Sequence, residues 1–323
     1  MSRYIARRLL SVIPLLIAVS IIVFGMSKAL PGDPVEIFLQ QADIANPELV
    51  KSMKDKYGLN DPLPVQYWTW LSLMFRGDMG ESIRRGERVS DLLFRGMRNT
   101  FSVAVASVIL VVVVGWTMGV LAAVVHNRAW PQVITRFLAQ SPVLMLSIPG
   151  FAVAVFMVLI FGVSLGWLPT SGVSNPRAGG DDVIDLAKHL ILPTIGLALA
   201  SVGANWRLAR NTMIEVLRED YIRMAHAKGL PLWRVYFVHG LRTTLVPLLT
   251  SAGLLFGSLL TGSFILEYIF AWPGIGLLVV ESTVNRDVPV VMGATMLIAT
   301  MYIFLNLAVD VIYALVDPRV RYA

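Results

Sequence analysis

The run Asn99–Asn127, NTFSVAVASVILVVVVGWTMGVLAAVVHN, contains no Asp, Glu, Lys or Arg. At about 1.5 Å of rise per residue, a helix of this length exceeds the roughly 30 Å hydrocarbon core of a bilayer. The run lacks the alternation of polar and apolar residues that is typical of a barrel strand, and otherwise only helices satisfy the backbone in lipid. We therefore predict that it crosses a membrane as a helix.

Five further uncharged runs have the same character: Leu9–Ser27, Phe137–Pro176, His189–Trp206, Thr243–Leu266 and Val288–Val309. The long run from Phe137 can hold one span and the start of an outer loop. Of the 323 residues, 56% are hydrophobic and only 15% are charged. We predict an all-α fold, a polytopic membrane helix bundle with six transmembrane helices. Prolines in or near the runs are expected at kinks or span ends: Pro14, Pro142, Pro149, Pro193 and Pro247.

Charges in the short loops orient the spans. Basic residues precede the first run and outnumber acidic residues between Arg207 and Arg242, whereas the loops near Asp185 and Glu281 lean acidic. The positive-inside rule then places both termini and the Arg207–Arg242 loop in the cytoplasm. The net charge of +6 reflects these loops rather than a nucleic-acid-binding domain. The absence of cysteine excludes disulfides, thiolate metal sites and a cysteine nucleophile.

The predicted organisation has four parts. Residues 1–30 form the N-terminal cytoplasmic end and the first span, 31–98 a long periplasmic loop, 99–316 a transmembrane core with a cytoplasmic loop at 207–245, and 317–323 a cytoplasmic tail. In the periplasmic loop, Asn46-Pro47-Glu48 is typical of a helix start and Gly58 of a stop. The aromatic segment Tyr67–Met74 can lie at the membrane surface. This loop is either a gate or docking surface for an external partner or a packed cap over the bundle.

The cytoplasmic loop carries the most informative pattern. Ile214, Leu217, Tyr221 and Met224 recur at three- and four-residue spacing, which predicts one apolar stripe on a helix. Gly229-Leu230-Pro231 ends that helix, because glycine suits the position after a helix end and proline cannot continue it. Pro231 can open a second short helix through Trp233 and Tyr236 before the fifth span. The stripe either enters a groove of a partner or packs on this chain's own spans.

The segment Glu219–Gly229, EDYIRMAHAKG, resembles the EAA loop of ABC importer permeases in its dipeptide/oligopeptide/nickel form. Other motifs of that family recur in order along nearly the whole chain: Leu30–Pro34 (LPGDP), Gly58–Leu63 (GLNDPL), Gly77–Gly80 (GDMG), Leu165–Pro169 (LGWLP), Glu267–Gly276 (EYIFAWPGIG) and Asp317–Arg319 (DPR). The early LPGDP motif and the long outer loop resemble the first of the two permease subunits of such systems. This chain departs from the general motif at Arg223, where the naming glutamate would stand, and at Met224, where the first alanine would stand.

The resemblance implies a coupling site for a partner ATPase at Glu219, Asp220, Tyr221, Arg223, Ala225, Ala227, Lys228 and Gly229. Closure of the ATPase dimer would move this helix and switch the spans between inward and outward states. The implied partners are a second homologous permease, two ATP-binding cassette subunits and a periplasmic or lipid-anchored solute-binding protein. The chain has no phosphate-binding Gly-x-x-x-x-Gly-Lys-Ser/Thr motif, so ATP and Mg²⁺ are expected on the partners, with no cofactor and no enzyme activity here.

The substrate is barely readable from the sequence. Glu267 is the clearest acid between apolar stretches, and with Ser263 it is a candidate for the substrate pathway, because buried carboxylates in membranes are costly. The alternative places Glu267 at the outer interface, where it helps to fix the turn at Trp272–Gly274. Peptides, glutathione-like thiols, nickel chelates and opine-like solutes all remain open. An ion-coupled secondary transporter is the alternative function, but it should show intramembrane acids or broken-helix repeats in two halves.

Overall fold

The computed structural model describes residues 2–29, 48, 52, 60–126, 130–174 and 183–316. In these ranges every element is helical except one isolated antiparallel bridge between Glu81 and Arg88. Internal contacts divide the chain into two compact units, residues 1–98 with 274–307 and residues 99–273 with 308–323. The predicted boundaries between outer loop, core and tail stay predictions. The helix expected from Asn46 to Gly58, the LPGDP motif and the DPR motif lie outside the described residues, apart from isolated positions.

Helices long and apolar enough to cross a membrane coincide with the predicted runs. They are Arg8–Ala29, Val89–His126, Val183–Val216, Leu232–Leu260 and Val288–Ala308. Each of the five overlaps one uncharged run, and the helix from Val183 continues ten residues beyond the predicted end at Trp206. The prediction of an all-α polytopic membrane bundle is therefore confirmed.

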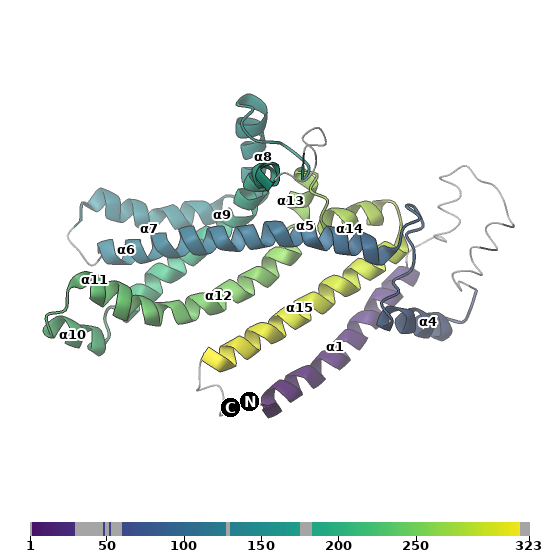
Figure 1. Ribbon diagram of the computed structural model, residues 1–323, viewed down its shortest axis with the longest axis horizontal. Coiled ribbons are helices and arrows are strands. Elements are labelled where there is room, and N and C mark those ends of the chain that lie inside the picture. The colour runs from purple at the N-terminus through teal and green to yellow at the C-terminus, as the bar shows by residue number, and fades with distance from the viewer. Residues whose placement is uncertain are drawn as a thin grey trace. The chain divides into compact units, whose positions relative to one another are not determined.

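The predicted third run is not one straight helix. α7 (Gln132–Ser147) meets α8 (Gly150–Met157), which continues as the π-helical segment η2 (Val158–Ser164), at a bend of 93°. Pro149 holds the preceding Ile148 in an extended conformation, with φ −100° and ψ 123°, because its ring clashes with a helical neighbour. Each arm extends only roughly 24 Å or less. The part of the chain that the structure describes thus holds five candidate spans, or six if the bent pair forms one broken span. Figure 1 shows α8 turning away from α7.

The second unit is assembled around α9 (Val183–Val216). This helix packs against η1 (Val111–Trp116), α6 (Thr117–His126), α7, α8 and α12 (Leu241–Gly262). Small residues bring these backbones together: a Cβ on Gly119 would lie 2.5 Å from the carbonyl oxygen of Trp206, and one on Gly203 would lie 2.8 Å from that of Pro142. Between helices in lipid the hydrophobic drive is weak, so such close packing holds the unit together.

Among its described residues, the first unit contains α1 (Ser2–Ala29), α4 (Leu63–Phe75), the beginning of α5 (Val89–Leu110) and the short α14 (Ile275–Val284). It also contains α15 (Val288–Val316) as far as Leu307. Leu93 of α5 packs with Ile275 of α14 and Val290 of α15. Val23 of α1 packs with Met292 and Met296 of α15. The unit therefore has a core of its own.

Candidate functional site

The predicted coupling residues lie on a short helix between two long ones. α9 ends at Val216, and after a turn the chain forms α10 (Asp220–Ala227). Glu219 is the N-cap residue of α10, and its carbonyl oxygen accepts the amide N–H groups of Ile222, at 3.1 Å, and Arg223, at 3.2 Å. In Figure 1, α10 and the neighbouring α11 (Leu232–Arg234) lie at one end of the second unit.

The predicted single stripe is wrong, because Ile214 and Leu217 precede the break between the two helices. Ile214 belongs to α9, whereas Tyr221 and Met224 belong to α10. The amide N–H of Leu217 still donates to the carbonyl of Met213, and then the amide of Glu219 donates to Val216 in a tight turn. The chain changes direction there without a glycine or proline.

The buried side of α10 is formed by Ile222 and Ala225. Ile222 is fully buried and Ala225 is 8% exposed. They join one cluster with Val120 and Ala123 of α6, Met213 of α9, Leu217, and Val235 and Tyr236 of the segment that follows α11. We call this cluster the floor of α10. It fixes the short helix to three neighbouring elements at once, so α10 cannot move without them.

Next to this buried side, α10 presents apolar groups to the exterior. Met224 is 60% exposed and Tyr221 is 42% exposed. The Tyr221 hydroxyl donates to the Thr243 hydroxyl oxygen at 3.0 Å, which holds the ring against the start of α12. Arg223 pairs with Asp220 at 3.2 Å, but both side chains are mostly exposed and such a pair contributes little. Packing on this chain's own helices thus holds for the buried side, and contact of the exposed residues with a partner stays a prediction.

The end of α10 is a Schellman motif. The amide of Gly229 donates to the carbonyl of His226 at 2.9 Å, and that of Leu230 donates to Ala225 at 3.3 Å. Gly229 has φ +72°, a conformation that side chains rarely adopt, while Lys228 before it remains at φ −76°. Leu230 packs against the floor of α10. The predicted stop at Gly229 is confirmed.

Pro231 does not open a separate short helix. It precedes α11, which passes without a break through the π-helical segment η4 (Val235–Gly240) into α12. Trp233 is 58% exposed on this segment, whereas Tyr236 is 7% exposed in the floor. The expected two-helix loop is therefore one short helix followed by the start of the next long helix.

The predicted pathway residues are buried together in the second unit. Ser263, at the end of α12, and Glu267, on α13 (Phe264–Ile269), are each 2% exposed. The hydroxyls of Ser263 and Thr100 both donate to Glu267 Oε1 at 2.7 Å. The backbone carbonyl of Glu267 accepts the amide of Trp272 at 2.8 Å. In this structure the contacts hold the turn after α13, and the pathway assignment stays a prediction.

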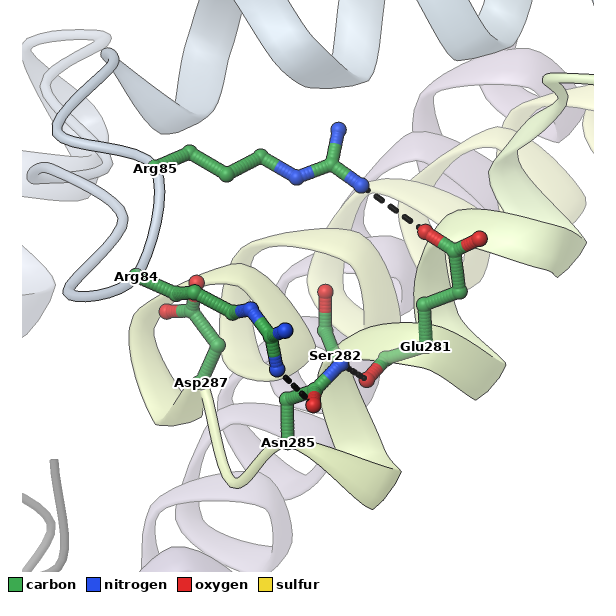
Figure 2. Close-up of a pocket in the computed structure, with 6 residues that line it drawn as sticks. All are labelled: Arg84, Arg85, Glu281, Ser282, Asn285 and Asp287. Carbon is green, nitrogen blue, oxygen red and sulfur yellow. Dashed lines mark hydrogen bonds and ion pairs between the residues drawn. The ribbon is translucent and has the colours of Figure 1, made fainter. Parts of the chain in front are cut away.

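A polar pocket in the first unit was not anticipated. It encloses about 300 Å³ between a hairpin at Arg84 and Arg85 and the end of α14, and its other lining residues are Glu281, Ser282, Asn285 and Asp287. Figure 2 shows both arginines reaching toward α14, where Arg85 pairs with Glu281 at 2.8 Å and Arg84 donates to Asn285. The buried Asp287 accepts from the Ser82 hydroxyl and from the amide of Ile83, at 3.2 Å. About two hundred residues separate these partners, so only the fold brings them together.

None of these sites resembles a metal centre. Among the described residues, no three His, Asp or Glu side chains gather closely enough to hold a metal ion. The structure instead contains the short helix α10, which packs on its own chain and exposes apolar side chains, and a charged pocket in the first unit. Both features suit contact with other macromolecules.

The family described as "Binding-protein-dependent transport system inner membrane component" matches residues 115–322, and its N-terminal counterpart matches residues 1–104. The oligopeptide transport system permease protein AppB of Bacillus subtilis is 40% identical over the whole of both chains. The glutathione transport system permease protein GsiC of Salmonella typhimurium is 39% identical, again over both whole chains. Among solved structures, the inward-facing MetNI methionine ABC transporter matches 70% of this chain and 96% of its own with a TM-score of 0.52 at 20% identity, which supports the fold.

Proposed function

This chain belongs to the binding-protein-dependent transport system inner membrane component family, as a permease subunit of an ABC importer, and we propose that α10 receives the force of ATP hydrolysis. Hydrolysis itself takes place on separate ATPase subunits. The family assignment favours this function over the ion-coupled secondary transporter. The observation that carries the proposal is the exposed apolar pair Tyr221 and Met224 on a helix whose other face is fixed to its own chain.

The contacts of α10 explain how force would reach the spans. Its exposed face fits a shallow groove of an ATPase, because large apolar side chains at a protruding helix are typical of a partner contact. Its floor joins it to α6, α9 and η4. A displacement of α10 by the closing ATPase dimer would therefore shift these helices together and change which side of the membrane the pathway opens to. Glu219, Asp220, Arg223, Ala227 and Lys228 would form the rim of this contact.

The proposed assembly contains this chain, a second homologous permease, two ATP-binding cassette subunits carrying ATP and Mg²⁺, and an external solute-binding protein. Both termini and α10 would lie in the cytoplasm, according to the excess of basic residues between Arg207 and Arg242. The same topology places the pocket of Arg85 and Glu281 on the outer face. We propose that this pocket contributes to docking of the solute-binding protein, since exposed charges guide such encounters.

The proposed substrate is a peptide or a peptide-like solute such as glutathione, because the names of two relatives carry these substrates. Ser263 and Glu267 would then stabilise the outer turn beside the pathway, as their mutual hydrogen bonds suggest. Binding assays on the cognate solute-binding protein, with di- and oligopeptides, glutathione, nickel chelates and opines, would identify the solute.

Cross-linking tests the coupling assignment directly, since the chain has no cysteine. Met224→Cys in the assembled complex, labelled with a thiol-reactive benzophenone, should cross-link to an ATPase subunit on illumination, because the photoactivated group inserts into C–H bonds of neighbouring residues. Trp167→Cys, similarly exposed at 67% but on the outer side in the proposed topology, is the matched control. An intact complex in which Met224→Cys gives no ATPase product, or in which both variants give the same product, would refute the proposal.

A further inference from the structure

We propose that α4 is a membrane-interface helix, embedded in the lipid leaflet at the end where α1 leaves the bilayer. With 13 residues it extends about 20 Å, too short to cross the hydrocarbon core. The proposal assigns a lipid surface, rather than water or another protein, to the open side of α4. It rests on the membrane span α1 and does not depend on which solute is transported.

The composition of α4 excludes a water-exposed helix. Its sequence, LPVQYWTWLSLMF, contains no charged residue, and the structure buries none of its residues fully. Trp68 is 70% exposed and Phe75 is 78% exposed, and Val65 lies on the same face at 48%. A helix that is apolar on nearly all sides is typical of an apolar environment. A single exposed apolar residue needs no explanation, but three on one helical face do.

Contacts with α1 define the depth of α4. Ser20, Phe24 and Lys28 lie one turn apart on the same side of α1, and all three contact α4. The Ser20 and Tyr67 hydroxyls lie 2.9 Å apart, the Phe24 and Tyr67 rings pack edge to face at 5.4 Å, and Lys28 donates to Gln66. From Ser20 to Lys28 the helix rises about 12 Å. Thus α4 lies beside the last two turns of the span α1. Its Gln66 accepts from Lys28, and a lysine at the end of a span typically places its charge among the lipid headgroups.

Contacts with a second span, at the start of α15, indicate the same depth of α4 in the bilayer. Trp70 and Met74 of α4 pack in one cluster with Val288, Met292 and Met296 of α15. The membrane-crossing part of α15 begins at Val288 itself. Both spans that flank α4 are therefore apolar at its level.

The same turns of α1 that contact α4 also expose large apolar side chains. α1 exposes Ile21 at 55%, Ile22 at 59% and Met26 at 67%, although it qualifies as a span by length and composition. In a membrane span, such side chains face acyl chains wherever no other membrane subunit covers them. Tryptophan and tyrosine at this level are typical of the membrane interface, where the ring is apolar and one edge is polar.

Site-directed spin labelling tests the proposal in the complete transporter, reconstituted in lipid nanodiscs with partner chains freed of cysteine. Single cysteines replace Trp68 or Phe75, and Ile21→Cys and Arg88→Cys serve as lipid and water references. Each label is probed for collisions with oxygen, which concentrates in lipid, and with a water-soluble paramagnetic chelate. Retained assembly and ATPase activity show that the variants are folded, as expected from the exposure of the replaced side chains.

The label at Trp68 or Phe75 should collide more with oxygen than with the chelate, as at Ile21. A label that collides mainly with the chelate, as at Arg88, would show a water-exposed helix and overturn the proposal. A label shielded from both reagents would also overturn it, because a second permease or a binding protein would then cover the face.

Discussion

Replacement of Gly229 by valine tests the backbone conformation that ends α10, the proposed coupling helix. A Cβ at this position would meet nothing within 4 Å, so the substitution causes no clash. The cost arises from φ +72°, which disfavours a side chain by about 1–2 kcal/mol. If the turn relaxes instead, two hydrogen bonds worth roughly 0.5–1.5 kcal/mol each are lost. Either route costs about 1–3 kcal/mol, which shifts the population of the native turn by roughly 5- to 150-fold.

The assay compares solute uptake with binding-protein-stimulated ATPase activity in proteoliposomes that contain the whole transporter. Gly229→Val should lower the number of solute molecules moved per ATP, since α10 would no longer be held on its floor. Gly229→Asn should remain close to the unmodified protein, because asparagine tolerates this conformation. Gly166→Val is the matched control, as Gly166 has φ +63° and open space around its Cβ but lies outside α10. Unchanged uptake and unchanged ATPase activity in Gly229→Val would refute the reasoning.

Three further substitutions test other contacts. Ile222→Ala should destabilise the permease by roughly 2–5 kcal/mol, which a lower thermal unfolding midpoint would report. Met224→Ala should leave that midpoint unchanged and weaken association with the ATPase. Equal effects of the two variants on the midpoint would contradict the separate buried and exposed sides of α10. Glu267→Leu removes the acceptor of two hydroxyls and should lower the midpoint by an amount equivalent to about 1–3 kcal/mol, with Glu267→Gln milder; a change of solute preference in either variant would instead support a pathway role. Arg85→Glu should reduce stimulation of the ATPase by the binding protein, most at low salt; recovery on adding Glu281→Arg would show that the pair only holds the hairpin and does not dock a partner.

The helical spans could be predicted because lipid imposes a simple rule on composition. Five of the uncharged runs became single long helices, whereas the run from Phe137 is bent by 93° at Pro149. Gly229 became the stop because only a residue without a side chain adopts its conformation freely. The break after Val216 could not be predicted. Leu217-Arg218-Glu219 are ordinary helix formers, and tertiary packing of Leu217 and Ile222 in the floor overrides their local preference.

The candidate sites could be predicted from the sequence only where one contiguous segment contains all of their residues. Glu219–Gly229 is contiguous, so its motif and its stop were visible in the sequence. The pocket joins Arg84 and Arg85 to residues about two hundred positions later in the chain. No local sequence pattern predicts contacts over such a separation. Likewise, Thr100 could not be assigned to Glu267, because an isolated threonine in an apolar run is equally typical of a hydroxyl bonded to its own helix.

The buried and exposed residues of α10 are subject to different constraints on substitution during evolution. Ile222 and Ala225 are committed to the protein's own interior, and a substitution there must be matched within the same polypeptide. Tyr221 and Met224 are exposed, and in the proposed assembly they would contact another gene product. A permease of this design could therefore acquire a new motor subunit by altering a few side chains on one surface, while its transmembrane architecture is inherited unchanged.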